Sequence, residues 1–169
     1  MADRNDLSVS AEQKAVIGES LANLPCGMWV LTADQEDRRM GMLVSWVQQV
    51  CFEPAMVTVA IEKGRAIMPL ISESRRFALC QLGAEDTIQH RKFQREPEPH
   101  EDPFLGLELL KARQAGLPIL KTSVGFLECE LSCHMDVEGD HDLFVGRVIA
   151  AARAEGEPLI RLRENGFTY

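Results

Sequence analysis

The sequence lacks the features that would place it at a membrane or on nucleic acid. No apolar run approaches the roughly 20 residues that a membrane-spanning helix needs, and the polar N-terminal stretch MADRNDLSVS has no apolar signal core. We therefore expect a cytoplasmic protein that does not bind membranes. The formal net charge is −8, and because phosphate backbones need a concentrated basic face, nucleic acid is not expected as a partner.

Motifs of several common enzyme classes are also missing. There is no Gly-x-Gly-x-x-Gly and no Walker loop, which argues against a Rossmann domain and a P-loop. There is no Gly-x-Ser-x-Gly, no His-Glu-x-x-His and no set of zinc ligands, so hydrolase and metalloprotease chemistry is not indicated. The five cysteines form no Cys-x-x-Cys pair, which predicts reduced, buried thiols. A metal site at His134 and His141 is disfavoured, because no further ligand is suitably spaced.

What the sequence does contain is typical of a small globular protein. Its 169 residues are 46% hydrophobic and 26% charged, which suits one domain with a single core. We expect that domain to occupy residues 1–169, with residues 1–10 flexible and the core in about 24–169.

The periodicity of the apolar residues predicts mainly strands. Ser10 and Gln13 resemble a capping box that begins a helix over residues 11–24. Strands are expected at 27–33, 40–49, 56–61, 77–82, 127–135 and 143–151, and shorter helices at 67–74 and 86–94. One helical turn is expected within 105–115, and an exposed loop or lid at 95–104. Six or more strands with few helices indicate an antiparallel, closed or nearly closed β-barrel.

Three segments carry polar groups that a purely structural strand or turn would not need. In GMLVSWVQQVCFEP, Ser45, Gln48 and Gln49 interrupt an apolar strand beside Trp46. Amides and hydroxyls at a strand end suit the edge of a flavin ring, which presents both donors and acceptors. The alternative is that these side chains simply face solvent.

The second segment, Glu62 to Ala66, lies between a strand and a helix. Lys63 and Arg65 flank Gly64 just before the expected helix start, and cations with free N–H groups at a helix N-terminus form an anion site. The third segment is the turn Glu138-Gly139-Asp140-His141, which can hold an imidazole over a pocket with Asp140 orienting it. A basic surface turn and an ordinary hairpin turn are the respective alternatives.

Taken in order, these segments resemble the flavin reductase-like, FMN-binding split-barrel family. The resemblance covers about residues 24–169 and rests on GMLVSWVQQVCFEP, VAIEKGRAIMPLI, SRRFALCQL, GLPIL, FLECEL and EGDHDLFVGRV. The pattern is most similar to the flavin reductase module at the C-terminus of some flavodiiron proteins. Three positions depart from the family pattern: Leu43 stands where a small hydroxyl residue is usual, Gln48 where serine or threonine is often found, and Cys80 where asparagine is common.

The resemblance implies a fold, a reaction and a site. The fold is a six-stranded antiparallel Greek-key split β-barrel with accessory helices, paired as a homodimer. The reaction is NAD(P)H-dependent reduction of FMN by hydride transfer, with electrons passed to an oxygenase or to another flavoprotein or diiron acceptor. His141 would place the nicotinamide, and the cofactor-binding residues would be Ser45, Trp46, Val47, Gln48 and Gln49 along the flavin, and Lys63, Arg65 and Ala66 at the phosphate.

Two other functions are compatible with the same residues. A non-catalytic FMN-binding electron-transfer protein could use the same barrel, although it would not need the Gly-Asp-His turn. A third and weaker interpretation keeps the barrel and exchanges the ligand for haem or pyridoxal phosphate, because a fold alone does not fix a function.

Overall fold

The computed structural model describes residues 9–98, 100–110 and 116–167. The flexibility expected for residues 1–10 concerns mostly residues 1–8, which lie outside the described residues. The chain divides into two compact units, Met1–Cys26 with Arg161–Tyr169, and Gly27–Ile160. That the whole chain behaves as one domain stays a prediction.

In the first unit, helix α1 (Ala11–Ala22) is held by the C-terminal segment. The helix begins after Ser10, whose Oγ accepts a hydrogen bond from the Gln13 N–H at 3.2 Å, as the capping pattern predicts. The Gly166 N–H donates to the Gly18 carbonyl at 2.8 Å. The Phe167 ring lies so close to Gly18 that a Cβ there would be 3.0 Å from a ring carbon, so a small residue is needed at this contact.

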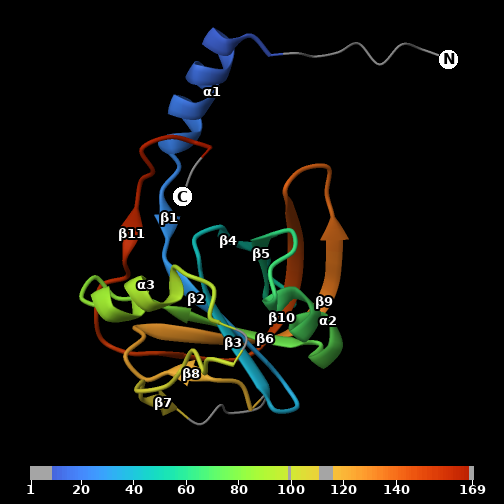
Figure 1. Cartoon of the computed structure of the whole chain (residues 1–169), viewed down its shortest axis with the longest axis vertical. Coiled ribbons are helices and arrows are strands. Elements are labelled where there is room, and N and C mark those ends of the chain that lie inside the picture. Colours follow the sequence, from blue (N-terminus) through green and yellow to red (C-terminus); the bar gives the residue numbers. More distant parts are fainter. Residues whose placement is uncertain (1–8, 99, 111–115, 168–169) are drawn as a thin grey trace, which may run out of the picture. The chain divides into compact units, whose positions relative to one another are not determined.

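The second unit is built on one antiparallel sheet of seven strands (Figure 1). Their order is β3-β2-β6-β9-β10-β5-β4. The strands are β2 (Trp29–Gln35), β3 (Arg38–Val44), β4 (Val47–Cys51), β5 (Met56–Glu62), β6 (Arg76–Gln81), β9 (Gly125–Asp136) and β10 (His141–Arg153). Two short ladders accompany it, β1 (Cys26–Gly27) with β11 (Ile160–Arg161), and β7 (Leu109–Leu110) with β8 (Ile119–Leu120). The predicted mainly β, antiparallel split-barrel fold class is confirmed, with seven strands in the sheet where six were expected.

The sheet is closed by a feature that the sequence did not predict. Residues 40–49 were expected to form one strand, but the strand is interrupted at Ser45 and Trp46. The residues before the interruption form β3 at one edge of the sheet, and those after it form β4 at the other edge. Because two residues can span only a few ångströms, the two edges must meet at this point, and the sheet curls into a split barrel.

Side chains on the two faces of the sheet form two separate apolar clusters. The inner cluster contains Leu31, Phe77, Cys129 and Phe144 together with helix α2 (Ile67–Ser74). The outer cluster covers the opposite face of β2, β6 and β9. It contains Val30, Cys80, Phe104, Phe126 and Phe93 of helix α3 (Thr87–Phe93). Strands β2 and β6 are therefore buried on both faces, which explains their nearly continuous apolar sequences.

The elements between the strands agree with the sequence patterns in part. Helices were expected at 67–74 and 86–94, and α2 and α3 occupy these segments. The one helical turn expected within 105–115 is not found in residues 105–110, which end in strand β7. Residues 111–115 lie outside the described residues, so the turn stays a prediction there. No helix in the described part of the chain is long and apolar enough to span a membrane.

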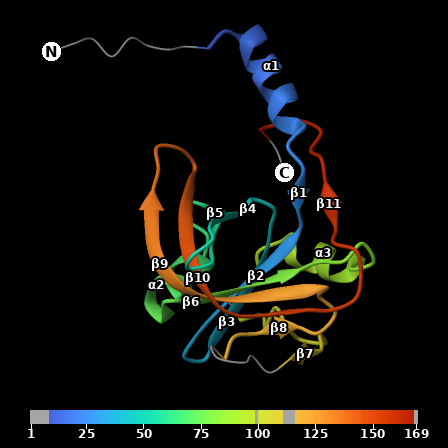
Figure 2. The ribbon, with the colours of Figure 1, turned by 180° about the vertical axis from the view of Figure 1, so that it is seen from behind.

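Strands β9 and β10 form a long hairpin (Figures 1 and 2). Near its tip β9 runs past β6, whose pairing ends at Glu130, whereas β10 stays paired with β5 up to His141. The first part of β9 is largely buried, whereas residues 132–136 are exposed. The alternation of residues 127–135 predicts a half-buried strand, and this is wrong at both ends: Glu128 is fully buried and Met135 is 48% exposed. The reason is that the outer cluster covers the second face near Glu128, while neither face is covered at the tip.

Candidate functional site

The three segments with unusual polar residues meet at one end of the β5–β10 ladder. Cα partners in this ladder include His141 with Glu62, so the Gly-Asp-His turn lies beside the turn that follows β5. The Lys63 N–H donates to the Asp140 carbonyl at 2.9 Å. The Trp46 ring contacts the His141 ring with centroids 4.7 Å apart and planes tilted by 47°. Residues that are far apart in the sequence thus form one site.

The Gly-Asp-His turn orients its imidazole. His141 Nδ1 lies 2.6 Å from Asp140 Oδ1, and the His141 side chain is 12% exposed against 90% for Asp140. The hydrogen bond from His141 lowers the pKa of the Asp140 carboxyl, so this carboxylate remains an acceptor at neutral pH and fixes Nδ1 as the donor. Gly139 has a φ of +151°, which side chains rarely adopt. The hairpin turn therefore needs glycine at this position.

Strand β4 offers fewer side chains to one ligand than the sequence suggested. Ser45 and Trp46 are partly buried at the junction between β3 and β4, and Val47 packs against the inner cluster. Gln48 and Gln49 are both exposed, but neighbouring residues of a strand point to opposite faces. Gln49 Nε2 donates to the Cys51 carbonyl at 3.2 Å. One ligand can therefore meet the side chain of Gln48 or of Gln49, whereas Val47 can offer only its backbone.

The outer face of β4 and β5 carries an unsatisfied polar atom beside Gln48. Thr58 is the Cα partner of Gln48 across the ladder, and directly opposite residues share a face. The Thr58 Oγ1 is buried and has no hydrogen-bond partner, and the same is true of the Arg65 Nε. Buried polar groups are rarely left unpaired, and a ligand could pair with these two atoms only where neighbouring side chains move to expose them, since both have almost no accessible surface.

In the turn after β5, Lys63 is fully engaged by the β9–β10 hairpin. Its Nζ lies 2.7 Å from Asp136 Oδ1, 2.9 Å from the Val137 carbonyl oxygen and 3.5 Å from Asp142 Oδ1. The hydrogen bond to Asp136 raises the pKa of Lys63 and lowers that of Asp136. Asp142 is buried and also lies 2.8 Å from His134 Nε2. Lys63 therefore acts as a tie between β5 and the hairpin.

Arg65 and Ala66 point to a different set of partners. Arg65 Nη2 lies 2.5 Å from Glu62 Oε2, and Arg65 Nη1 lies 3.7 Å from Glu96 Oε2. The Ala66 N–H, at the start of α2, donates to Glu96 Oε1 at 3.0 Å. Gly64 has a φ of +88°, and a Cβ added to it would have nothing within 4 Å, so the turn is open on that side. This half of the turn binds a carboxylate in the way expected of an anion site.

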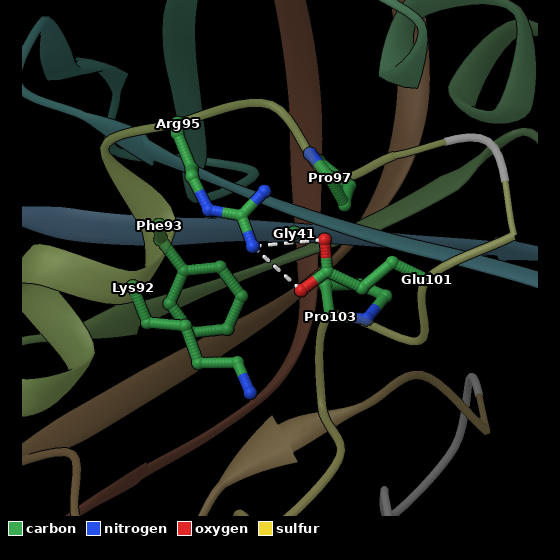
Figure 3. Close-up of a pocket in the computed structure, with 7 residues that line it drawn as sticks. All are labelled: Gly41, Lys92, Phe93, Arg95, Pro97, Glu101 and Pro103. Atoms are coloured by element: carbon green, nitrogen blue, oxygen red, sulfur yellow. Dashed lines mark hydrogen bonds and ion pairs between the residues drawn. The ribbon is translucent and has the colours of Figure 1, made fainter.

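Glu96 belongs to the loop 95–104, which is anchored beside strand β3 (Figure 3). Arg95 Nη2 binds both carboxylate oxygens of Glu101, at 2.7 and 2.9 Å. Arg39 of β3 binds Asp102 through two nitrogens, and these hydrogen bonds lower the pKa of Asp102. A small pocket between loop and strand is lined by Gly41, Lys92, Phe93, Arg95, Pro97, Glu101 and Pro103. The loop was expected to be exposed, and ion pairs at both ends hold it in place.

Of the three departures from the family pattern, Gln48 lies in the candidate site on β4, whereas the other two belong to the outer cluster. Leu43 and Cys80 both pack in or against the outer cluster. Burial raises the pKa of the Cys80 thiol to about 12, and its Sγ accepts a hydrogen bond from the Leu120 N–H at 3.4 Å. All five cysteines are free, but their predicted burial is wrong for Cys51, which is half-buried, and for Cys133, which is exposed. Cys133 lies in the part of β9 that extends past β6.

Sequence reasoning missed the acidic residues that surround the site. Asp136, Asp142 and Glu96 decide which cations are engaged, yet each is 30 or more positions from its cation. The Glu96-Pro97 pair within a charged loop gave no sign of its target, because only the fold brings the loop to α2. Among the residues described, no group of three or more His, Cys, Asp or Glu side chains is arranged to hold a metal ion.

Comparisons with known proteins agree on one family. The family described as "Flavin reductase like domain" matches residues 21–166. Diflavin flavoprotein A 1 of Synechocystis is 32% identical over 154 residues, which are 89% of this chain but 26% of that protein. The FMN reductase (NADH) SmoA of Agrobacterium fabrum is 29% identical over 140 residues, 83% of this chain and 77% of that protein. The chain spans about a quarter of the length of the diflavin flavoproteins that it matches.

Among solved structures, the styrene monooxygenase flavin reductase of Pseudomonas putida S12 is similar to this chain. The two are 29% identical with a TM-score of 0.71, and the match covers 83% of this chain and 88% of that one. The similarity therefore extends through most of the barrel.

Proposed function

Since the chain belongs to the flavin reductase-like family, we propose that it is an NAD(P)H-dependent FMN reductase. The observation that carries the proposal is the contact between Trp46 and His141 at 4.7 Å. It brings the polar strand end to the Gly-Asp-His turn, and the Lys63–Asp140 hydrogen bond brings the anion-binding turn to the same place. A flavin ring, its phosphate and a nicotinamide would need these three elements side by side.

The cofactor would be held along the ends of β4 and β5. Ser45, Trp46, Gln48 and the backbone of Val47 would line the ring and the ribityl chain, with Gln49 at the margin. Thr58 Oγ1 and Arg65 Nε have no partner and could each gain one only where neighbouring side chains move to expose them. The phosphate would be held by Arg65, the Ala66 N–H and, to a smaller degree, Lys63. When bound, FMN accepts a hydride from the nicotinamide and passes electrons on.

His141 would act by placing the nicotinamide. Asp140 holds Nδ1 and thereby sets the direction of the ring, and Trp46 limits its tilt. Hydride transfer needs donor and acceptor within about 3–3.5 Å, and the transfer itself needs no general acid. The protein would therefore contribute orientation and a partly buried surface, and the absence of a Rossmann motif fits a nicotinamide that binds only transiently.

We further propose a homodimer and a separate electron acceptor. Phe52 is 90% exposed and Val50 50% exposed at the end of β4, and an apolar patch at a strand end is typical of a protein interface. The acceptor would be an oxygenase or another flavoprotein or diiron protein, in keeping with relatives named as a diflavin flavoprotein and a monooxygenase flavin reductase. Light scattering on a sizing column tests the dimer, and a monomer that still binds FMN tightly would contradict it.

The proposed activity can be tested with one equivalent of FMN under argon. We expect NADH or NADPH to bleach the oxidised flavin band much faster with the protein than with free FMN. Equal rates would refute the reductase. Persistent FMN binding without bleaching would favour the electron-transfer protein, and a purified protein that binds haem or pyridoxal phosphate would be recognised from its absorbance spectrum.

A matched variant on the same hairpin can distinguish the role of the His141 side chain from damage to the fold of the hairpin. His141→Ala should slow flavin reduction by about tenfold to a hundredfold, the usual cost of losing orientation, and leave FMN affinity unchanged. His134→Ala removes a histidine that also pairs with an aspartate but lies outside the proposed site, so it should retain the rate. Equal loss in both variants would point to damage of the hairpin.

A further inference from the structure

Glu96 occupies the donors that the proposed function assigns to the phosphate. One of its carboxylate oxygens accepts the Ala66 N–H at 3.0 Å, and the other lies 3.7 Å from Arg65 Nη1. A backbone N–H at a helix start together with a guanidinium is a typical binding set for a phosphate. The carboxylate of this chain therefore sits on the same two donors, in the manner of a bound anion.

The position of Glu96 is fixed by its neighbours along the loop. The Arg95–Glu101 ion pair joins the residue directly before Glu96 to one five positions after it (Figure 3). The Glu98 N–H also donates to Glu101 Oε2, at 3.2 Å. Pro97 restricts the residue before it to an extended backbone. Glu96 thus reaches the start of α2 from a pre-shaped loop.

Two anions cannot share these donors. A phosphate that approached Ala66 and Arg65 would meet the Glu96 carboxylate at contact distance, where like charges repel strongly. The phosphate must therefore displace the carboxylate. Breaking the contacts of Glu96 with Ala66 and Arg65 costs free energy, and this cost reduces the affinity of the protein for the phosphate. A ligand without a phosphate has no reason to compete.

We propose that Glu96 is an internal competitor for the phosphate of the flavin, and that it weakens the binding of phosphorylated flavin selectively. This inference rests on the proposed function, because it takes FMN as the ligand. Its consequence is a flavin that leaves the protein readily, as is needed when reduced FMN is delivered to a separate acceptor.

The test compares two glutamates in one loop. Glu96→Gln removes the charge at the donors, and Glu98→Gln removes the same charge two residues away, where the exposed side chain leaves Ala66 and Arg65 untouched. Affinities for FMN and riboflavin are measured by calorimetry. We expect Glu96→Gln to bind FMN about five- to tenfold more tightly, roughly the effect of one charge-assisted contact. Glu98→Gln should change the affinity for FMN by less than about twofold, and the affinity for riboflavin should stay constant in both variants.

A second readout keeps the inference separate from the identity of the ligand. The Ala66 amide signal in an NMR spectrum is followed while inorganic phosphate is added. If FMN binds more tightly than riboflavin but Glu96→Gln does not tighten it, the reductase stands and the competitor is refuted. If no variant binds flavin, the reductase fails and so does competition with a flavin; a phosphate-induced shift of the Ala66 signal at lower concentration in Glu96→Gln than in the parent protein would then show only that Glu96 competes with inorganic phosphate at these donors. If phosphate moves the Ala66 signal in neither protein, the competitor is refuted as well.

Discussion

Lys63 and Arg65 carry the same charge two residues apart, but the structure gives them different kinds of partner. The Lys63 ammonium is bound by Asp136, Val137 and Asp142, all in the β9–β10 hairpin. The Arg65 guanidinium is bound by Glu62 of its own turn and by Glu96 of a loop. The charge pattern alone makes the two cations equivalent, whereas the fold commits one to holding strands together and leaves the other with partners that a ligand can replace.

The difference arises from what each partner is attached to. Asp136 and Asp142 are Cα partners across the β9–β10 ladder, so their separation is set by backbone hydrogen bonds. Asp142 is only 5% exposed, and a buried carboxylate needs its partners. Glu96 belongs to a loop and is exposed. Exchanging the partner of Arg65 for a ligand therefore costs less than exchanging those of Lys63.

The largest expected effect is on phosphate recognition. Arg65→Gln should weaken FMN binding by about tenfold or more, as expected for the loss of a guanidinium–phosphate pair, and Lys63→Gln by less than about threefold. Riboflavin affinity should be the same in both variants and in the parent protein. Calorimetric titrations measure these affinities. An equal loss of FMN affinity in the two variants would show that Lys63 breaks its ion pairs with the aspartates to bind the ligand.

The order should be reversed for stability. Lys63→Gln removes the ion pairs with Asp136 and with the buried Asp142, so we expect a measurable fall in the free energy of unfolding. Arg65→Gln breaks pairs that are largely exposed and should cost less than about 0.5 kcal/mol. Urea unfolding measures both. Lys121→Gln, which breaks an exposed pair with Glu108, is the control; a loss in Lys63→Gln no greater than in this control would contradict the tie.

The smallest effect is a shift in one titration. The hydrogen bond from Lys63 lowers the pKa of Asp136 below its ordinary value of 3.8. The pair therefore contributes stability above that value, which is lost as the pH falls through the lowered pKa. In Lys63→Gln the pKa of Asp136, followed through its carboxyl signal in carbon-13 NMR, should return toward 3.8. The pKa of Asp140 should stay low in both proteins, because His141 is its main partner. A shift of the pKa of both carboxyls together would indicate a change in the whole hairpin.

Much of the fold followed from local patterns, because strands with buried alternate residues and a capped helix are encoded within a few positions. The predicted helix at 11–24 and strand at 56–61 correspond to α1 and β5 to within two residues at each end. The strand expected over 40–49 was wrong because no local signal marks Ser45 and Trp46 as the place where the chain changes edge. The burial of Glu128 was also missed, because it depends on residues from other strands and loops.

The site was predictable as a set of segments but not as an arrangement. Ser45, Trp46, Lys63, Arg65 and His141 were singled out from unusual residues in strands and turns, and the ladder between β5 and β10 brings their segments together. Their roles stay predictions. The partners of the cations could not be foreseen, because an acidic residue far along the chain is one among many until strand register and loop anchoring select it.

The junction at Ser45 and Trp46 also has a consequence for how this chain could be rearranged. Strands β3 and β4 are the free edges of the sheet, and exposed edges can pair with other molecules. A circular permutant with new termini between Ser45 and Trp46 would retain every strand and every register but lose the covalent link between those edges. In such a protein only packing in the inner cluster, to which β3, β4 and β5 all contribute, would hold the edges together, and we expect it to pair edge to edge with other molecules more readily than the parent chain.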